Sequence, residues 1–546
     1  MNTRQIGTSL ACVLVASMVT MGIAMLAPAT ASAAQPRVPH APEPRPKLVV
    51  GIFVEGLTAD YVDLLRSGMG ADGFNRLISQ GVSIDNVDYG PGVDATAATA
   101  ILVSGTAPGV NGIPSARVWD TTSRLDIPVL LDPSKAGRYT DADLTATPIK
   151  VSTLADEVRI ADGGLGAVHS IALDPQTAII LAGHAGNSAA WISDTDGKWT
   201  RSSSHPDMPS ALSRRNVGLT LASRLDTLSW QPLKALDTYP DLPAYKKTYP
   251  FRYTFPARLA DRFTQFKASA AGNHEIVAAA ADYISTLRLG SRDFTDMISL
   301  GLDVSPYPYS TDADNRLERM DAILRLDADI AQIVKAIEAG PGMANTLLFV
   351  AGTPAPPSVR RDDDRWGVPS GQFSPRKATS LLNMYLMALH GNGEWVSGYH
   401  NGFFFLNRRL IKERDLGEAA IRAEAAEFLA RMSGVADVYT IDDILARRAG
   451  DTPMAIQRNI SPEHAGDLMV RVSPGWVISD SETSDELAQQ PVVRWAATTS
   501  PVYILAPTLS ATEIVETIDA RAIAPTVARL LRIRSPNGAA LPPLMF

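Results

Sequence analysis

Cysteine is almost absent from this chain of 546 residues, since Cys12 is the only one. Cys12 lies within an apolar N-terminal run, so the rest of the chain has no disulfide, no thiolate nucleophile and no cysteine-ligated zinc. Histidine is also scarce, with eight residues, and the histidines beyond the N-terminal segment do not cluster at the spacing of metal ligands.

A strong charge of either sign is absent as well. Charged residues make up 20% of the chain, and its formal net charge is −8. Nothing in the overall electrostatics therefore favours nucleic acid or an anionic membrane as a partner, and we predict no nucleic-acid partner.

Only one hydrophobic run approaches the length of a membrane span, at residues 6–26. Arg4 precedes this run, and the segment Ala31-Ser32-Ala33 that follows it fits the small-x-small pattern accepted by signal peptidase. We predict a signal peptide over residues 1–33 and a protein exported to the periplasm or the extracellular space, with no membrane span in the mature chain. An uncleaved N-terminal anchor is the alternative.

Strand-like and helix-like segments alternate after a proline-rich spacer at residues 34–46. Residues 47–55 form a continuous apolar run, as is typical of a buried parallel strand. The other predicted strands are 82–87, 167–173, 296–302, 346–351 and 502–506. The predicted helices are 73–80, 153–160, 274–287, 316–339, 376–390 and 521–531. This alternation predicts one α/β domain over residues 47–546, with a mostly parallel central sheet sandwiched by helices.

Residues 197–267 interrupt the alternation and are predicted to form an inserted cap. This interval is rich in Trp, Tyr, Pro and Arg and lacks a clear period. Within it, the sequence KKTYPFRY (246–253) mixes cations with aromatic rings. That composition suits sugar stacking or anion binding, but it equally suits a cap that packs its rings on the core and exposes its charges to solvent.

Four stretches together resemble the alkaline phosphatase superfamily, specifically its monoesterase and type I phosphodiesterase/nucleotide pyrophosphatase branches. They cover almost the whole mature chain in the family's order, and they read KLVVGIFVEGL (47–57), SGTAPGVNGI (104–113), SIALDPQTAIILAGH (170–184) and IAPTVARLLRIRSPNG (523–538). The resemblance implies an alkaline-phosphatase-like fold.

The resemblance also implies a particular chemistry. In that family two zinc ions about 4 Å apart stabilise the attacking and leaving oxygens of a displacement at phosphorus. They are held by a first-strand Asp, a D-x-x-x-H motif, a D-H pair and a late His, and they activate a Thr or Ser nucleophile.

Carried over residue by residue, most of this machinery is missing. The first-strand Asp falls on Glu55, and the Asp of D-x-x-x-H is retained as Asp303. The nucleophile falls on Ala95. The remaining metal ligands fall on Tyr307, Thr353, Pro354 and Thr499, and the Lys-x-Arg that grips phosphate falls on Asp174 and Gln176. Because each zinc ion needs about four ligands, a two-zinc site cannot be built from Glu55 and Asp303. We expect no cofactor, or at most a single divalent metal such as zinc on these two carboxylates.

Two further sets of residues keep open alternatives. Thr96 begins a predicted helix capped by Asp94, where it could act as a relocated nucleophile near an anion-binding helix end, or simply pack against the sheet. His169 and His184 flank a predicted strand, and core packing is weighed there against metal binding.

Two functions follow from these observations. The first is a catalytically degenerate family member that binds a small phosphorylated or glycan ligand, or an envelope protein. The second is an active metal-dependent phosphatase or phosphodiesterase with a site rebuilt from Glu55, Asp303 and Thr96. In both cases we expect Glu55, Ala95, Asp303, Thr353 and Thr499 to converge at the carboxyl edge of one sheet, where α/β folds place their sites.

Overall fold

The computed structural model describes residues 45–132, 134, 143–310, 312, 314–356, 367, 369–446, 456–488, 490–495 and 499–546. The predicted signal peptide, residues 1–33, and residues 34–44 of the spacer lie outside this range. Residues 45–546 form one compact unit. None of the helices in the described ranges is both long enough and apolar enough to cross a bilayer.

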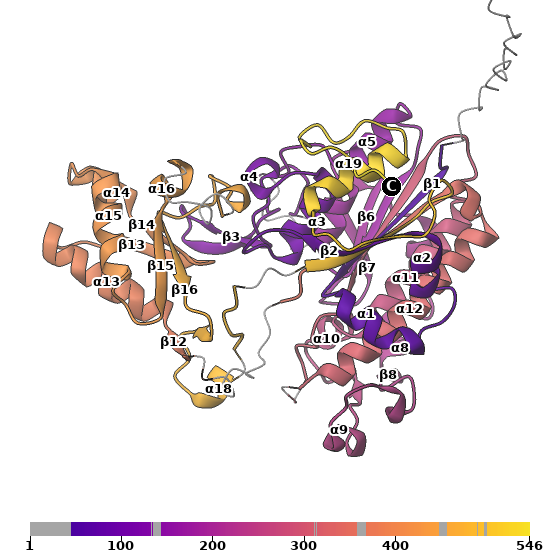
Figure 1. Ribbon diagram of the computed structural model, residues 1–546, viewed down its shortest axis with the longest axis horizontal. Coiled ribbons are helices and arrows are strands. Elements are labelled where there is room, and N and C mark those ends of the chain that lie inside the picture. Colours follow the sequence, from indigo (N-terminus) through magenta and orange to yellow (C-terminus); the bar gives the residue numbers. More distant parts are fainter. Residues whose placement is uncertain are drawn as a thin grey trace, which may run out of the picture. The chain divides into compact units, whose positions relative to one another are not determined.

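A ten-stranded sheet forms the centre of this unit (Figure 1). Its order is β19-β2-β18-β11-β1-β10-β5-β6-β7, with β20 paired to β2. The strands are β1 (Leu48–Glu55), β2 (Val82–Asp88), β5 (Val168–Ala172), β6 (Ser188–Ile192), β7 (Trp199–Pro206), β10 (Asp296–Asp303), β11 (Thr346–Thr353), β18 (Thr499–Leu505), β19 (Thr512–Ile514) and β20 (Ile518–Asp519). The core run β11-β1-β10-β5-β6 is parallel, whereas β18 and β7 are antiparallel to their neighbours. The predicted mostly parallel α/β sheet is confirmed.

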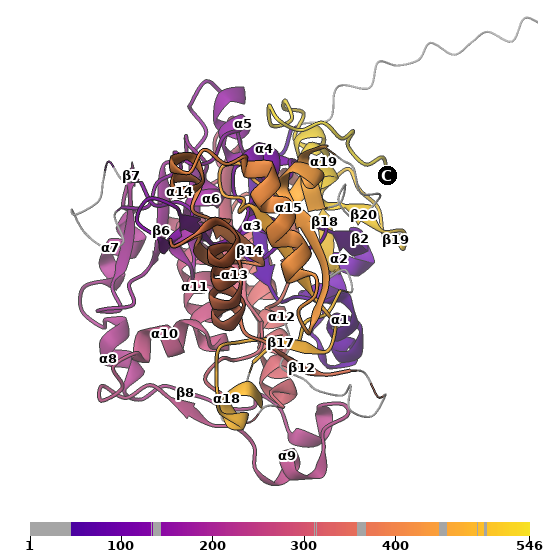
Figure 2. The same cartoon turned by 90° about the vertical axis from the view of Figure 1, so that its left-hand side faces the viewer.

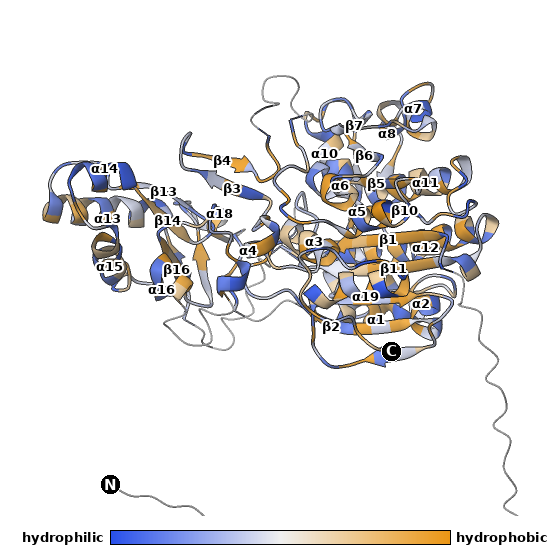
Figure 3. Ribbon diagram, turned by 90° about the horizontal axis from the view of Figure 1, so that it is seen from above, coloured by the Kyte–Doolittle hydropathy of each residue, from blue (hydrophilic) through white to orange (hydrophobic). Residues whose placement is uncertain are grey.

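Helices cover both faces of this sheet, because its central strands are apolar on both sides. One face packs against α1 (Ala59–Leu65), α2 (Phe74–Gln80), α11 (Ala270–Thr286) and α12 (Arg316–Ala339). The other packs against α3 (Ala95–Ser104), α5 (Leu154–Ala161), α6 (Pro175–Ala182) and α19 (Ile523–Leu530). Seven of the eight residues of β1 are buried, and the central strands are coloured mainly as hydrophobic in Figure 3. Two layers of helices are what such two-sided apolar strands require.

A second, smaller sheet was not predicted from the sequence. Its order is β13-β14-β16-β15, and every pairing in it is antiparallel. Figure 2 shows α13 (Pro375–His390) and α15 (Glu418–Leu429) over this sheet. These two helices, α14 (Arg408–Glu413) and the four strands share a hydrophobic core of their own. The elements are β13 (Val396–His400), β14 (Phe403–Leu406), β15 (Val435–Thr440), β16 (Leu468–Val472), α13 (Pro375–His390), α14 (Arg408–Glu413) and α15 (Glu418–Leu429).

The hairpin of β3 (Arg117–Asp120) and β4 (Leu125–Pro128) contacts the small sheet. The ring centroids of Trp119 and Phe405 lie 6.0 Å apart, and His400 Nε2 lies 3.0 Å from the carbonyl oxygen of Arg117. The remaining short elements are α4 (Pro108–Asn111), β12 (Gly371–Phe373), α16 (Ile441–Ala446), β17 (Trp476–Ile478) and α18 (Ser484–Ala488).

The interval predicted as a cap begins with a strand of the central sheet. β7 pairs antiparallel with β6, so the insertion proper starts after Pro206. The sequence WTRSSSHP lacks an apolar period because two of its fully buried side chains, Ser202 and His205, are polar. The cap itself consists of α7 (Ser210–Arg215), α8 (Leu221–Leu225), β8 (Ser229–Trp230), α9 (Ala244–Thr248), β9 (Tyr253–Thr254) and α10 (Arg262–Lys267).

Candidate functional site

Three strand ends bring the candidate residues side by side. Glu55, the last residue of β1, pairs in register with Asp303 of β10 on one side and with Thr353 of β11 on the other. Neighbouring strands lie about 4.8 Å apart, so these three residues form one row at the carboxyl edge of the sheet. Thr499 begins β18, the strand on the far side of β11, and its hydroxyl is 3.2 Å from Asn86 Oδ1.

The row faces the layer that contains α3 and α6. Side chains alternate between the two faces of a strand, so Glu55 points to the same side as Phe53, and Thr353 to the same side as Ala351. Phe53 and Ala351 both belong to the core that packs against α3 and α6. The sheet therefore aims this row at the start of α3, where Ala95 and Thr96 lie.

Like charges surround Glu55. Its pKa is raised well above the ordinary value, first by burial and then by the carboxylates of Asp303, Asp174 and Asp94. The pKa of Asp303 is also raised by burial, against the opposing effects of a hydrogen bond from Ser305 N (2.7 Å) and of the nearby Arg319 guanidinium. Both side chains are partly exposed. Together with the carboxylates of Asp174 and Asp94 they form a group that we name the acidic cluster.

The side chain of Asn273 holds the backbone of Asp303. Asn273 Nδ2 donates to the Asp303 carbonyl oxygen at 2.6 Å, and Asn273 Oδ1 accepts from Asp303 N at 2.9 Å. Behind this strand end, Arg319 donates to the carbonyl oxygen of Gly56 (2.7 Å) and lies 4.3 Å from the Tyr61 ring centroid. The Arg319 guanidinium is thus engaged by the Gly56 carbonyl oxygen and the Tyr61 ring.

Asp94 caps α3 as the sequence predicts. Its carboxylate accepts from Ala97 N at 2.9 Å and from Ala116 N at 2.7 Å, although burial still raises its pKa. Thr96 follows within the buried face of α3, at 7% exposure. In the described part of the chain no histidine or lysine side chain hydrogen-bonds to the Thr96 hydroxyl.

The positions at which the resemblance would place family residues have structural roles in this chain. Tyr307 is buried in an aromatic cluster with the cap. The centroid of its ring lies 5.2 Å from the Trp230 ring centroid and 4.6 Å from that of Tyr253. Asp174 caps α6 by accepting from Thr177 N at 2.7 Å. Gln176 donates to the Ala116 carbonyl oxygen at 3.0 Å and accepts from Leu130 N at 3.1 Å.

These residues do not fit the pair of zinc ions that the resemblance implies. Phenol, hydroxyl and proline side chains replace the imidazoles and carboxylates that zinc prefers. Within the described ranges, no three His, Cys, Asp or Glu residues are grouped so that they could hold a metal ion. The arrangement offers a row of acceptors for hydrogen bonds and little to grip a phosphate.

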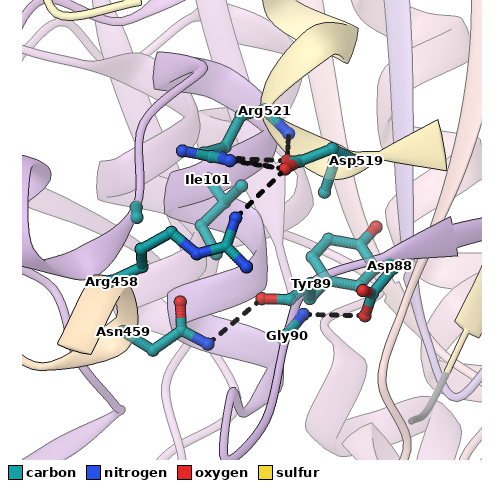
Figure 4. A pocket seen from close by; sticks show the side chains of 10 residues that line it. Asp88, Tyr89, Gly90, Ile101, Arg458, Asn459, Asp519 and Arg521 are labelled. Carbon is teal, nitrogen blue, oxygen red and sulfur yellow. Dashed lines mark hydrogen bonds and ion pairs between the residues drawn. The ribbon is translucent and has the colours of Figure 1, made fainter. Parts of the chain in front are cut away.

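The sequence analysis missed a small pocket beside the end of β2 (Figure 4). Arg521 Nε lies 2.9 Å from Asp519 Oδ1, and Arg458 Nη1 lies 3.7 Å from Asp519 Oδ2. Asn459 Nδ2 donates to the Tyr89 carbonyl oxygen at 3.3 Å. The pocket joins segments more than 350 positions apart, so no local pattern could have revealed it. Its two arginines share one carboxylate and are not free to bind an anion strongly.

His169 and His184, for which core packing and metal binding are the alternatives, lie in different surroundings. His169 is buried, with Nδ1 2.8 Å from Ser188 Oγ, and burial lowers its pKa to about 4. His184 has an acceptor at each ring nitrogen, Asp156 Oδ2 at 3.1 Å from Nδ1 and the Ile149 carbonyl oxygen at 2.9 Å from Nε2. Only the imidazolium can donate to both, and the hydrogen bond to Asp156 is the main cause of a raised His184 pKa.

We expect His184 to make stability depend on pH. Because its pKa is raised on folding, its stabilisation is fully present below the unfolded value of about 6.5 and is lost as the pH rises through the higher folded value. The difference in unfolding free energy between the wild type and His184→Gln should therefore shrink as the pH rises from about 6 to about 9. Urea denaturation across this range measures it, and a difference that is constant with pH would contradict the assignment.

Comparison with known proteins agrees with the fold. Residues 49–496 match the profile of the family described as type I phosphodiesterase / nucleotide pyrophosphatase. A calcium-transporting ATPase of Myroides odoratus is 26% identical over 90% of this chain and 93% of its own. The alkaline phosphatase PhoV of Synechococcus elongatus is 25% identical over 90% of this chain and 91% of its own. The crystal structure of the alkaline phosphatase PafA superposes with a TM-score of 0.77 at 22% identity, covering 92% of this chain and 98% of that one, which shows a shared fold.

Proposed function

Since the chain belongs to the type I phosphodiesterase / nucleotide pyrophosphatase family, within the alkaline phosphatase superfamily, we propose that it has kept the fold and lost the hydrolysis. In this proposal it is an exported protein that binds a ligand at the carboxyl edge of the sheet. The observation that supports it best is the row Asp303–Glu55–Thr353, in which two carboxylates adjoin a hydroxyl and no imidazole is present.

Electrostatics argue against a phosphoric ester as this ligand. Three carboxylates, those of Asp303, Asp174 and Asp94, already raise the pKa of Glu55. The same field repels a phosphate group, whose negative charge would add to theirs. The family positions that would supply compensating cations hold Asp174 and Gln176, and both side chains are engaged with backbone groups. A neutral or positively charged ligand that donates hydrogen bonds suits the acidic cluster better.

Catalysis faces a second obstacle at the nucleophile. The resemblance places the family's nucleophile on Ala95 at the start of α3, and a methyl group cannot attack phosphorus. Thr96 is adjacent, but a hydroxyl needs a metal or a base within hydrogen-bond reach to become a nucleophile. The neighbouring Asp94 carboxylate is already occupied by two backbone N–H groups.

The alternative is an active hydrolase with a rebuilt site. The in-register pairing of Glu55 with Asp303 favours it, because two carboxylates on adjacent strands are a plausible start for a single divalent metal such as zinc. Thr96 would then serve as the relocated nucleophile.

Metal content and hydrolysis measured together decide between these functions. Mature protein purified from zinc-containing medium is expected to hold well under two zinc ions per chain. It should turn over aryl phosphates, phosphodiesters and sulfate esters weakly, and Thr96→Ala should leave that background rate unchanged, because no group activates the hydroxyl. Removing a working nucleophile costs several orders of magnitude in rate. Robust turnover that disappears in Thr96→Ala would establish the rebuilt enzyme.

A further inference from the structure

Helix α13 carries no charged side chain along most of its length. Its sequence between Lys377 and His390 reads ATSLLNMYLMAL. Three residues on one side of the helix are buried in the core of the small sheet, namely Ala378, Leu382 and Leu386. Figures 1 and 2 both show α13 on the outer side of this sheet, so the opposite side of the helix faces away from the core. A helix face in contact with water is normally polar or charged, and this one is not.

The outward apolar side chains lie in one stripe along the helix. Leu381, Met384 and Ala388 are spaced by three and four residues, which places them on the same side of an α-helix. Leu381 is 46% exposed and Met384 62%, and Ala388 is exposed as well. Lys377, also exposed, lies four residues before Leu381 and continues this side towards the N-terminus. We name the side chains of Lys377, Leu381, Met384 and Ala388 the α13 stripe.

The two ends of the α13 stripe complement each other in charge. Lys377 lies in the first turn of the helix, where the positive end of the helix dipole disfavours a cation. The last turn carries the negative end of the dipole. Glu424 of α15 lies beside that turn, with Oε2 2.6 Å from His390 Nε2 and its side chain 39% exposed. A second copy of the helix laid antiparallel brings each Lys377 to the other copy's C-terminal end, where a cation is favoured.

We propose that the α13 stripe is the contact of a homodimer, in which α13 packs antiparallel against α13 of a second copy. The spacing of four, three and four residues along the stripe is that of the seam between two packed helices. With the two-fold axis near Met384, Leu381 of one copy faces Ala388 of the other, so that a large side chain meets a small one. A two-fold interface requires such a self-complementary surface. This inference goes beyond the proposed ligand-binding function and does not depend on it.

A second copy suits this face better than an anionic membrane. A helix that lies on such a membrane carries cations along its polar side. The only lysine and arginine residues of α13 are Arg376 and Lys377, both at one end. The ring of Tyr385 stacks on Phe428 of the neighbouring helix α15, which also exposes the carboxylate of Glu427. Anionic lipid headgroups would repel that charge.

Sedimentation equilibrium of the mature protein between about 1 and about 100 µM tests the proposal. A helix of 16 residues is about 24 Å long, so one helix pair makes a small interface. We therefore expect a monomer–dimer equilibrium with a Kd on the order of 10 µM. Leu381→Glu/Met384→Glu should weaken the dimer at least about tenfold, because it would bury unpaired charges at the contact. At the lowest concentration this variant should melt like the wild type, since both side chains are exposed in the single copy.

A cross-link tests the antiparallel arrangement. Met384→Cys introduces the only thiol of the mature chain, since Cys12 lies in the predicted signal peptide. Because the two-fold axis places position 384 against itself, mild oxidation should link two copies through a disulfide. Ala423→Cys, at an exposed position of α15, is the matched control and should give little linked dimer. Equal linking in both variants would contradict the arrangement.

The control for the charged variant is Val217→Glu/Leu219→Glu, which replaces two apolar side chains of the cap that are 76% and 77% exposed. It should dimerise like the wild type. A wild type that stays monomeric at about 100 µM would overturn the proposal, and so would a dimer that Leu381→Glu/Met384→Glu leaves intact. Flotation with phosphatidylglycerol vesicles, lost in Leu381→Glu/Met384→Glu while no dimer forms, would make the face a membrane contact instead.

Discussion

Replacing Asp321 with alanine is expected to destabilise the protein by about 3 to 5 kcal/mol, the range for removing one partner from a buried charged network. Asp321 lies on α12 at 0% exposure and accepts four hydrogen bonds. The donors are Trp230 Nε1 (2.7 Å), Leu233 N (2.6 Å), Tyr239 OH (2.7 Å) and Arg325 Nε (2.7 Å). Three of them belong to the cap, so this one carboxylate fastens the insertion to the helix layer.

The effect should appear first in the cap. Without the carboxylate, the buried donors on Trp230 and Tyr239 lose their acceptor while remaining out of water, which is the costly case. Limited proteolysis of Asp321→Ala should therefore cut within residues 210–267 before the central sheet, and urea denaturation should give the loss of free energy.

Glu338→Ala is the matched control for this prediction. Glu338 lies on the same helix with its side chain 49% exposed and paired with Arg76 at 2.7 Å. An exposed pair of this kind contributes less than about 1 kcal/mol. If Asp321→Ala costs no more than Glu338→Ala, the cap is held by its aromatic contacts and not by this network.

Local patterns predicted the main elements well, because their signals lie within a few residues. Helix α12 has the predicted bounds, and β1 differs from its predicted strand by one residue at the start. The placement of Glu55, Asp303 and Thr353 also followed from local information. Each ends a buried apolar run, and parallel strands end at the same edge of a sheet.

What could not be predicted depends on contacts between distant segments. The apolar run of β18 shows that it is buried but not that it runs antiparallel between β11 and β2. The small sheet was missed because its strands are short and two of them, β13 and β15, are not strongly apolar. Nothing near Tyr307 indicates that the cap folds onto its ring, since Trp230 is 77 positions away (307 minus 230). The sequence shows that residue 307 is a tyrosine, but not that its ring packs against the cap.

The contacts of Tyr307 show what this position does in the structure. The resemblance places a metal-binding histidine here, and an imidazole would have to be free beside Asp303 to serve as a ligand. The phenol ring is instead shared between Trp230 and Tyr253 of the cap. Tyr307 thus joins the cap to the segment that follows β10.

Removing the charge of Glu55, at the centre of the acidic cluster, should make the protein more stable. Glu55→Gln keeps the shape of the side chain and removes a charge that burial and the carboxylates of Asp303, Asp174 and Asp94 all disfavour. We expect it to raise the free energy of unfolding at neutral pH by about 1 to 2 kcal/mol, a usual gain when an unfavourable charge is removed from a functional site. Such strain is typical of sites kept for binding rather than for stability.

The pH dependence of this gain identifies its cause. Because folding raises the pKa of Glu55, the stabilisation from its protonated form is present below about 4.5 and is lost as the pH rises through the folded value. The advantage of Glu55→Gln should thus be absent near pH 4, grow as the pH rises and then level off, in urea denaturation measured with a chelator present. Glu516→Gln, at an exposed carboxylate without a partner among the described residues, should change stability little at any pH. If the same measurement without the chelator makes Glu55→Gln less stable than the wild type at neutral pH, a bound cation holds this carboxylate, and the rebuilt metal site is favoured over the degenerate one.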